Sequence, residues 1–544
     1  MEIKDAVRLA ILNIQKESIT DVDVFARPFE VNYLAQEKNK KIIYDIVVER
    51  IKNALYKLNK GKEPFEALKE LHLSPLRSIL IPKKNLFEFR KCSYTEPIDE
   101  IIYLSLVLLI APKIEKQRIN SNKEIVFSYR LKKDLIEEIK PTYIFDFNFS
   151  YTPFRTSISK KAQKTGAKIV ISCDISNFYD RLNLHRLENT LLALPGIDKN
   201  VVALINEMLL FWSNRDSYGL PVGSNASRIL AEASLINVDK FMLGKNIEFI
   251  RFVDDFRIFT KDAKEAHTYL SILVERLNQE GLFLNTTKTK IASISEIKSD
   301  SKPEKSSDVA EKEKSELPLI IRGYSGIIPT KFRKLSDSEI NNLKELEVQN
   351  IYNEKINKDL IDPVELQKYI RCLVAQQKWT ELAQVSLILN RFPQFIPYYL
   401  DCISKNMESL NNNDKNLINN NIINLVQDSS LLEYLRVYIF RFLAKNEINK
   451  KFLLETYLNL RRGEGIYLGR ALLEDLSQYL DRDDVLEIKK GFQRADASEK
   501  RIILRLMHHK LNKDEFNVFV KNISLTENDP WIQVIYNETI RNIK

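Results

Sequence analysis

The sequence predicts an α+β domain followed by an all-α domain, and two observations support this prediction. Short β-branched runs alternate with helical stretches between Leu80 and Ile291. After residue 335 the apolar side chains recur at helical spacing as far as residue 544. A small sheet covered by helices fits the first pattern, and helices packed on helices fit the second.

The chain divides into three predicted regions, because its 544 residues exceed the roughly 100–200 residues of an ordinary domain. Residues 1–75 are expected to form a helical N-terminal extension, 76–334 the α+β domain and 335–544 the helical domain. Residues 298–316 contain almost no apolar side chains, which predicts a flexible, charged surface insertion. The strand-like segment 317–329 is expected to return the chain to the α+β domain.

Composition narrows the class of protein. Hydrophobic residues make up 44% of the chain, enough for packed cores. The net charge of +9 permits a phosphate-binding channel, although a solvated mixed-charge surface explains it as well. Four cysteines without a CxxC pair disfavour disulfides and structural zinc and fit a reducing cytoplasm. The apolar run 101–112 is shorter than the ~20 residues that span a bilayer, so we expect a buried core helix and no membrane partner.

Three stretches of the helical domain resemble one another. Each has a central arginine, and these arginines, Arg436, Arg470 and Arg501, lie 34 and 31 residues apart. Such a period suits a helical-repeat (HEAT-like) solenoid, in which each helix pair buries one face on the next pair. An unrelated all-helical bundle is the alternative.

Three segments of the α+β domain combine into one candidate site. The apolar run 169–172 leads into Asp174, which places this residue at a strand end. Apolar residues flank Asp254 and Asp255 on both sides, as in two short strands joined by a tight turn. Between them, residues 218–232 (YGLPVGSNASRILAE) form a Gly/Pro/Ser-rich loop that opens an amphipathic helix. A buried acidic pair is costly unless a cation balances it.

Each of these signals has an ordinary alternative, since an Asp pair in a hairpin is usually a solvated turn and a strand-end Asp usually caps a helix. Their order and spacing are more specific. Nucleotidyl transfer uses two Mg²⁺ ions roughly 3.5–4 Å apart. Mg²⁺ takes oxygen ligands from a few carboxylates and from substrate phosphates. Carboxylates on two separate strands meet that need, so Mg²⁺ is the expected cofactor.

On these residues the α+β region resembles the reverse transcriptases. Asp174 falls at the first metal-binding aspartate of their palm, and Phe252-Val253-Asp254-Asp255 at their tyrosine-x-Asp-Asp motif, with Phe in place of Tyr. The fingers segments of bacterial intron- and retron-like enzymes are similar to Ile81-Pro82-Lys83, Arg90, Asp99 and Tyr129-Arg130. The resemblance ends near Lys290 and implies the palm and fingers of a right-hand polymerase.

Residues 219–233, together with the long helical half, are similar to the abortive-infection and defence-associated reverse transcriptases of bacteria. The usual motif carries Gln after its Leu-Pro pair, whereas this chain carries Val222. That departure weakens the expectation of ordinary templated copying, and some members of the group make DNA without a template on a protein hydroxyl. The resemblance thus implies a DNA polymerase acting in antiphage defence, either templated or untemplated and protein-primed.

The resemblance also assigns catalytic roles. Asp174, Asp254 and Asp255, with the carbonyl of Ile175, would hold the metal ions, and Asp255 would be the weaker ligand. Lys288 falls at the palm lysine that protonates pyrophosphate, and a solvated strand-end lysine is its alternative.

Other positions would bind the nucleotide. Lys83 and Arg90 would hold the triphosphate, because their cationic groups neutralise phosphate oxygens, although Lys83 could equally be a surface charge. Tyr179 would stack under the sugar and select dNTPs, with a core aromatic as the alternative. Val222 and Gly223 would line the nucleotide site.

The remaining assignments concern nucleic acid and partners. Arg130 and Arg228 would contact primer or template, but Arg228 could instead pair with Glu232 at i,i+4. The implied partners are dNTPs, a template RNA or self-made DNA, and further copies of the chain in a homo-oligomer. Two other functions stay open. One is a non-catalytic sensor or scaffold, which the retained acidic residues disfavour. The other is a mobile-element enzyme of the retron or intron type, which the long helical half disfavours.

Overall fold

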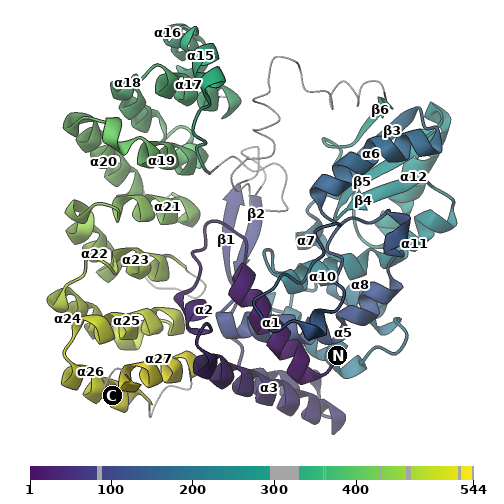
Figure 1. Ribbon diagram of the computed structural model, residues 1–544, viewed down its shortest axis with the longest axis horizontal. Helices are drawn as coiled ribbons and strands as arrows, with labels where there is room; N and C mark the ends of the chain where they lie inside the picture. Colours follow the sequence, from purple (N-terminus) through teal and green to yellow (C-terminus); the bar gives the residue numbers. More distant parts are fainter. Residues whose placement is uncertain are drawn as a thin grey trace. The chain divides into compact units, whose positions relative to one another are not determined.

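A computed structural model describes residues 1–82, 89–294, 330–358, 361, 363–427, 431–460, 467–524 and 529–541 (Figure 1). Two compact units make up the chain. The first lies within residues 1–21, 27–77 and 92–302, and the second within 22–26, 78–91 and 303–544. The predictions for Lys83, for the insertion at 298–316 and for the strand at 317–329 fall outside the described residues.

The N-terminal helices of the first unit pack on its core. They are α1 (Ile3–Glu17), α2 (Phe29–Tyr33), α3 (Glu37–Asn59) and α4 (Pro64–Leu68). Helix α1 packs on α3 and on α5 (Pro97–Gln117). Most side chains of α5 are buried, which confirms the core helix predicted from the apolar run 101–112. The N-terminal helices therefore share a core with the residues that follow them.

An antiparallel sheet organises the first unit. In the part of the chain that the structure describes, it contains β3 (Ile169–Asp174), β4 (Phe249–Phe252), β5 (Asp255–Thr260) and β6 (Lys290–Ser293) in the order β4-β5-β3-β6. The strands predicted at 167–176 and 248–260 are confirmed. The strand predicted at 282–293 is shorter, because the Asn285 side chain accepts a hydrogen bond from the Thr287 amide and holds a turn.

The chain before and between these strands also forms helices. They are α6 (Tyr151–Thr165), α7 (Phe178–Arg181), α8 (Leu184–Leu192), α9 (Lys199–Trp212), α10 (Asn225–Ser234), α11 (Ile236–Gly244) and α12 (Ala263–Gln279). Helix α6 packs on β4 and β5, and α12 on β3 and β5. The separate strands β1 (Arg77–Pro82) and β2 (Phe89–Tyr94) pair with each other.

The second unit is helical over its described C-terminal part. Its longer helices are α15 (Asp337–Lys344), α17 (Pro363–Ala375), α18 (Trp379–Gln384), α19 (Ile396–Lys405), α20 (Asn412–Gln427), α21 (Glu433–Leu443), α22 (Lys450–Leu458), α23 (Leu468–Leu476), α24 (Arg482–Lys490), α25 (Ala497–Lys510), α26 (Lys513–Ser524) and α27 (Pro530–Arg541). Every second helix packs on the next in a single stack (Figure 1), which consists of α19, α21, α23, α25 and α27. Three consecutive helices of this stack, α21, α23 and α25, contain Arg436, Arg470 and Arg501.

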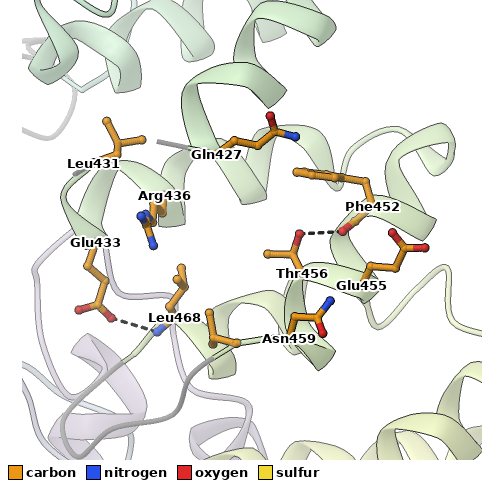
Figure 2. Close-up of a pocket in the computed structure, with 10 residues that line it drawn as sticks. Gln427, Leu431, Glu433, Arg436, Phe452, Glu455, Thr456, Asn459 and Leu468 are labelled. Atoms are coloured by element: carbon orange, nitrogen blue, oxygen red, sulfur yellow. Dashed lines mark hydrogen bonds between the residues drawn. The ribbon is translucent and has the colours of Figure 1, made fainter. Parts of the chain in front are cut away.

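A pocket of about 720 Å³ opens between α20, α21, α22 and α23 of this unit (Figure 2). Arg436, Glu455 and Asn459 line it together with apolar side chains. Glu433, at its edge, accepts hydrogen bonds from the amides of Tyr467 and Leu468 and so caps α23.

Two simple expectations can be compared with the structure. All four cysteines are buried and free. Among the helices described, none is both long and apolar enough to cross a bilayer.

Candidate active site

The acidic residues predicted from the sequence meet at one end of the sheet. In the β3–β5 register Asp174 lies directly opposite Asp255, and Asp254 occupies the turn before β5. The amide of Ile175 donates to the Asp254 carbonyl at 3.1 Å, which fixes the end of β3 against this turn. The structure therefore brings together carboxylates from two strands that lie far apart in the sequence.

Lys288 joins the acidic cluster. Its Nζ donates to Asp174 Oδ2 at 3.0 Å, although the side chain is 44% exposed. The loop that carries it is anchored on the same residue, because the Asn285 amide donates to the Asp174 carbonyl at 2.7 Å. Backbone and side-chain contacts together hold this lysine next to Asp174.

The charge of Asp254 is disfavoured where it lies. Burial, and after it the neighbouring Asp174 carboxylate, raises the pKa of Asp254 to about 7. A divalent cation would reverse this shift, since it compensates both carboxylates at once. Asp174 and Asp254 thus fit Mg²⁺ by the chemistry of their donor atoms. Among the described residues, however, no group of three or more His, Cys, Asp or Glu side chains is arranged to hold a metal ion.

Asp255 is occupied by another partner. Its carboxylate forms an ion pair with Arg257, two residues along the same face of β5. The Arg257 guanidinium lies over the Phe154 ring at 5.6 Å from its centroid. Asp255 would have to exchange this contact to join Asp174 and Asp254 around a metal, so its weaker metal-binding role stays a prediction.

The turn that presents Asp254 has an unusual backbone. Val253 has a φ of +54°, in the left-handed region that β-branched residues rarely adopt. Both of its backbone groups are bound by buried side chains: its amide donates to Ser128 Oγ at 2.9 Å, and its carbonyl accepts from Arg251 Nη1 at 2.9 Å. Such a conformation persists where the surrounding contacts determine it.

Arg251 belongs to a buried charge network under this turn. Its guanidinium is fully buried and donates to Glu232 at 2.9 and 3.1 Å and to Asp239 at 2.6 and 2.8 Å. Arg118 donates to Glu232 as well, at 2.6 Å, and Ser128 donates to it at 2.5 Å. The network connects α10, α11 and the segment after α5 to the acidic hairpin.

The network keeps Glu232 ionised. Burial alone would raise the pKa of Glu232, but Arg251 and Arg118 outweigh it, so the pKa is lowered. Burial raises the pKa of Asp239 in spite of Arg251. The sequence prediction considered Glu232 only as a partner of Arg228 and assigned no role to Arg118, Asp239 or Arg251. The signal available was an arginine inside the apolar strand Phe249–Phe252.

The loop before α10 lies beside the first acidic segment. The amide of Leu220 donates to the carbonyl of Tyr179, whose side chain is 7% exposed. Val222 is buried, and its carbonyl accepts from the Ser93 amide at 3.2 Å. Gly223 has a φ of +115°, which favours glycine at this position. Ser224 then caps α10 and also donates to Glu100 at 2.5 Å.

Replacing Glu100 with Gln is expected to flatten the pH dependence of stability. Burial raises the pKa of Glu100 from 4.5 to about 7, although hydrogen bonds from Ser224 and Thr95 oppose the shift. The folded protein therefore holds this proton at a pH where the unfolded chain has lost it. Stability from this group is lost as the pH rises from 4.5 to 7, by about 3 kcal/mol. Urea midpoints measured across this range are expected to fall less in Glu100→Gln than in wild type or in the exposed control Glu37→Gln, while other buried carboxyl groups such as Asp254 keep part of the pH dependence.

The predicted substrate-binding arginines are placed differently. Arg228 is 8% exposed and pairs with Asp21, while its Nη1 donates to Asn225 at 2.6 Å. Glu232, the alternative partner of Arg228, is bound by Arg118 and Arg251 instead. Arg130 is 2% exposed, and its guanidinium is engaged by Glu115 at 2.8 Å. Arg90 is half-buried on β2, in the segment that belongs to the second unit.

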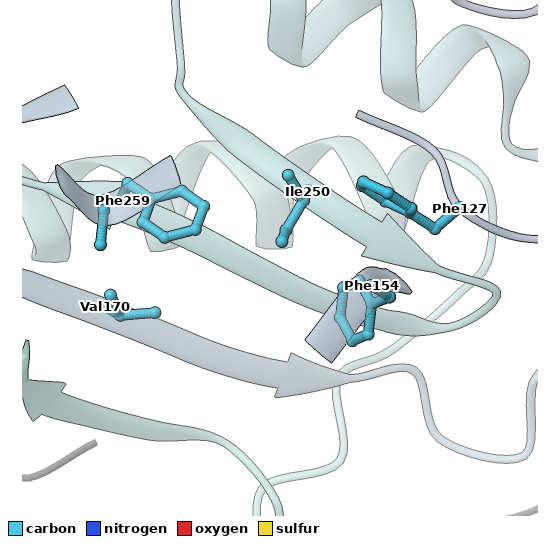
Figure 3. Packing of buried hydrophobic residues seen from close by; sticks show 6 residues of the cluster. Phe127, Phe154, Val170, Ile250 and Phe259 are labelled. Carbon is cyan, nitrogen blue, oxygen red and sulfur yellow. The ribbon is translucent and has the colours of Figure 1, made fainter. Parts of the chain in front are cut away.

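Apolar packing supports the acidic end of the sheet. Val170, Ile250 and Phe259 share one face with Asp174 and Asp255, because side chains alternate along a strand. Phe154 and Ala162 of α6 close over this apolar part, together with Phe127 (Figure 3). Phe252, at the end of β4, packs edge-on against Tyr151, with 5.4 Å between the ring centroids. Its ring centroid lies 6.0 Å from that of Phe154.

Comparison with known proteins gives one family. Residues 113–320 match the family described as reverse transcriptase (RNA-dependent DNA polymerase). No curated protein matches the chain. Among solved structures, the chain is similar to telomerase from Candida albicans in complex with the TWJ fragment of telomeric RNA. The identity is 13%, the TM-score 0.28, and the match covers 69% of this chain and 64% of that one. It is also similar to apo telomerase from Candida tropicalis, at 12% identity and a TM-score of 0.29, over 85% of this chain and 68% of that one.

These comparisons identify a domain. The chain spans only 64% of the length of the first telomerase structure, and the TM-scores are low, so the telomerase likeness does not bear on its function. The family match covers the strands and the hairpin that hold Asp174, Asp254 and Asp255. Residues 113–320 are therefore a reverse transcriptase domain, that is, an RNA-directed DNA polymerase domain with palm and fingers.

Proposed function

We propose that this protein adds dNTPs to a DNA strand by two-metal nucleotidyl transfer, with Asp174 and Asp254 as the main metal ligands. One observation supports the proposal above all. Two carboxylates from separate strands lie close enough for Asp174 to raise the pKa of Asp254, and Lys288 lies beside them at 3.0 Å from Asp174. When bound, Mg²⁺ ions would activate the attacking 3′-hydroxyl and stabilise the leaving pyrophosphate.

The side chains around the metal ligands would orient and neutralise. Lys288 would offer a positive charge and a proton to the pyrophosphate, from a loop anchored on the Asp174 carbonyl. Arg251 and Ser128 would hold Asp254 in place through the backbone of Val253. A site fixed in this way needs little reorganisation when substrate arrives.

We further propose that the protein belongs to the bacterial defence-associated group and acts against phage in the cytoplasm, as a homo-oligomer. The stacked helices of the second unit would be HEAT-like repeats, because each of α19, α21, α23, α25 and α27 packs on the next. Val222 is 2% exposed and presents no polar group, unlike the glutamine of templated enzymes. This supports untemplated, protein-primed synthesis over the copying of a template RNA.

The test is a product assay with purified protein, Mg²⁺ and each dNTP separately or together. We expect incorporation without added template, and a product that enters the phenol phase because it is linked to protein. Incorporation that requires an added RNA template would replace untemplated synthesis by copying. No incorporation under any condition would contradict the polymerase function itself.

A non-catalytic sensor or scaffold is the second candidate, and the ion pair between Asp255 and Arg257 favours it, since one of the three acidic groups is already engaged. Cells that carry the Asp254→Ala, Asp255→Ala double variant separate the two. Loss of phage protection, with normal protein abundance, supports the enzyme. Full protection supports the scaffold.

A further inference from the structure

An aromatic segment leads from the first unit's core to α6. Residues 143–151 place a ring at every second position: Tyr143, Phe145, Phe147, Phe149 and Tyr151. Two of these rings are exposed, Phe147 at 62% and Tyr151 at 45%. Phe147 packs edge-on against Tyr143 at 4.9 Å, and Tyr151 packs edge-on against Phe252 at 5.4 Å. Neighbouring contacts thus hold both exposed rings in place.

Helix α6 continues this segment with positive charge only. Its 15 residues include four cations, Arg155, Lys160, Lys161 and Lys164, and no Asp or Glu. The chain as a whole is nearly balanced, with 83 basic and 74 acidic residues, so a helix of one sign stands out. Lys161 pairs with Glu248 at 2.6 Å. Arg155, Lys160 and Lys164 are exposed and form no ion pair with any described residue.

The exposed side of α6 has hydrogen-bonding groups between its cations. Thr152, Thr156, Ser159 and Gln163 are all exposed there. The opposite side is fixed to the sheet by Phe154 and Ala162 (Figure 3). We call residues 143–164 the aromatic–basic track. Tyr151 brings the track beside Phe252, two residues before Asp254, and α6 continues from there across the apolar face of the sheet.

We propose that the aromatic–basic track binds a single strand of nucleic acid next to the catalytic centre. Phe147 and Tyr151 would stack on bases, and the exposed cations of α6 would neutralise successive phosphates. Single-stranded nucleic acid suits such a surface, because every base has a face that stacks on an aromatic ring and every linkage carries a negative charge. The choice of nucleic acid over an acidic protein rests on the proposed polymerase function, since a strand must pass the hairpin that carries Asp254.

The first test measures binding of oligo-dT to full-length protein across a range of salt concentrations. Each phosphate contact contributes about 0.7 to the slope of log affinity against log salt for single strands. The triple variant Arg155→Gln, Lys160→Gln, Lys164→Gln is expected to bind more weakly and to lower the slope by about two. The matched control Lys240→Gln, Lys245→Gln, Lys264→Gln removes the same charge from exposed positions on or beside α11 and α12. We expect it to keep the wild-type slope.

The second test addresses the rings. The double variant Phe147→Ala, Tyr151→Ala is expected to lose roughly ten-fold or more in affinity for oligo-dT. Its loss for a DNA duplex should be smaller, because paired bases offer no free faces. The control Tyr56→Ala, Phe65→Ala removes two rings that are 63% and 50% exposed on α3 and α4, and should bind as wild type does. Thermal melting of every variant checks that the fold is kept.

The outcomes separate the track from the polymerase function. If wild type binds oligo-dT and both track variants bind it with the same affinity and the same salt slope, the track does not bind the strand. The proposed polymerase function is unaffected by that result. If poly-glutamate competes at the track better than oligo-dT does, an acidic protein is the partner and the proposal is overturned. If wild type binds no oligonucleotide and incorporates no dNTP, both proposals fall.

Discussion

Replacing Asp254 with Asn is expected to lower dNTP incorporation by roughly 10³-fold or more while the fold is kept. The amide has nearly the shape of the carboxylate but cannot balance the charge of a metal ion. Without metal, the ionised carboxylate of Asp254 also destabilises the folded protein, since burial and Asp174 raise its pKa to about 7. The variant should therefore be at least as stable as wild type and inactive, which incorporation assays and thermal melting on the same preparation would show.

Asp255→Asn should lose less activity than Asp254→Asn. Asp255 pairs with Arg257 in the structure, and its removal leaves both Asp174 and Asp254 in place. Asp262→Asn is the control, because Asp262 only caps α12 and Asn caps helices equally well. A full loss of dNTP incorporation in Asp255→Asn, with only a mild loss in Asp254→Asn, would contradict the assignment of Asp254 as the main metal ligand.

Much of the fold could be predicted because local pattern decides it. A run of apolar or β-branched residues was long enough to predict the type of three elements, namely β3, the β4–β5 hairpin and the core helix α5. The strand predicted at 282–293 was too long, since the hydrogen bond within the turn at Asn285 competes with strand pairing. The helices α21, α23 and α25 each contain one of the three similarly spaced arginines, and the HEAT-like repeat inferred from that spacing stays a prediction.

The supporting contacts of the site could not be predicted in the same way. The pattern indicated that Asp174 and Asp254 converge, but it did not indicate what holds them. Arg251 meets Glu232 and Asp239 only when three elements pack together, so no local spacing reveals that ion network. Arg228 illustrates the same limit, because the i,i+4 rule pointed to Glu232 whereas the ion pair forms with Asp21, 207 residues away.

Replacing Arg251 with Met is expected to destabilise the first unit by about 3–5 kcal/mol. The substitution leaves Asp239 without its guanidinium partner and Glu232 with Arg118 and Ser128, in a site where both carboxylates are almost fully buried. The loss of stability in Arg251→Lys should be smaller than in Arg251→Met but still measurable, because one ammonium group cannot form paired contacts with two carboxylates. The midpoint of urea unfolding gives the measurement. Arg215→Met is the control, since Arg215 is 51% exposed in its ion pair with Glu207 and should cost no more than about 1 kcal/mol.

A second readout separates positioning from mere stability. Arg251 also holds the Val253 carbonyl, and Val253 has a backbone conformation that it would not adopt unaided. Loss of this contact should free the turn and let Asp254 leave its place beside Asp174. At a temperature where the Arg251→Lys variant stays folded, kcat should therefore fall while the KM for dNTP changes little. A variant that is destabilised yet keeps the wild-type kcat would show that Arg251 supports the fold alone, and that the hairpin keeps Asp254 in position without it.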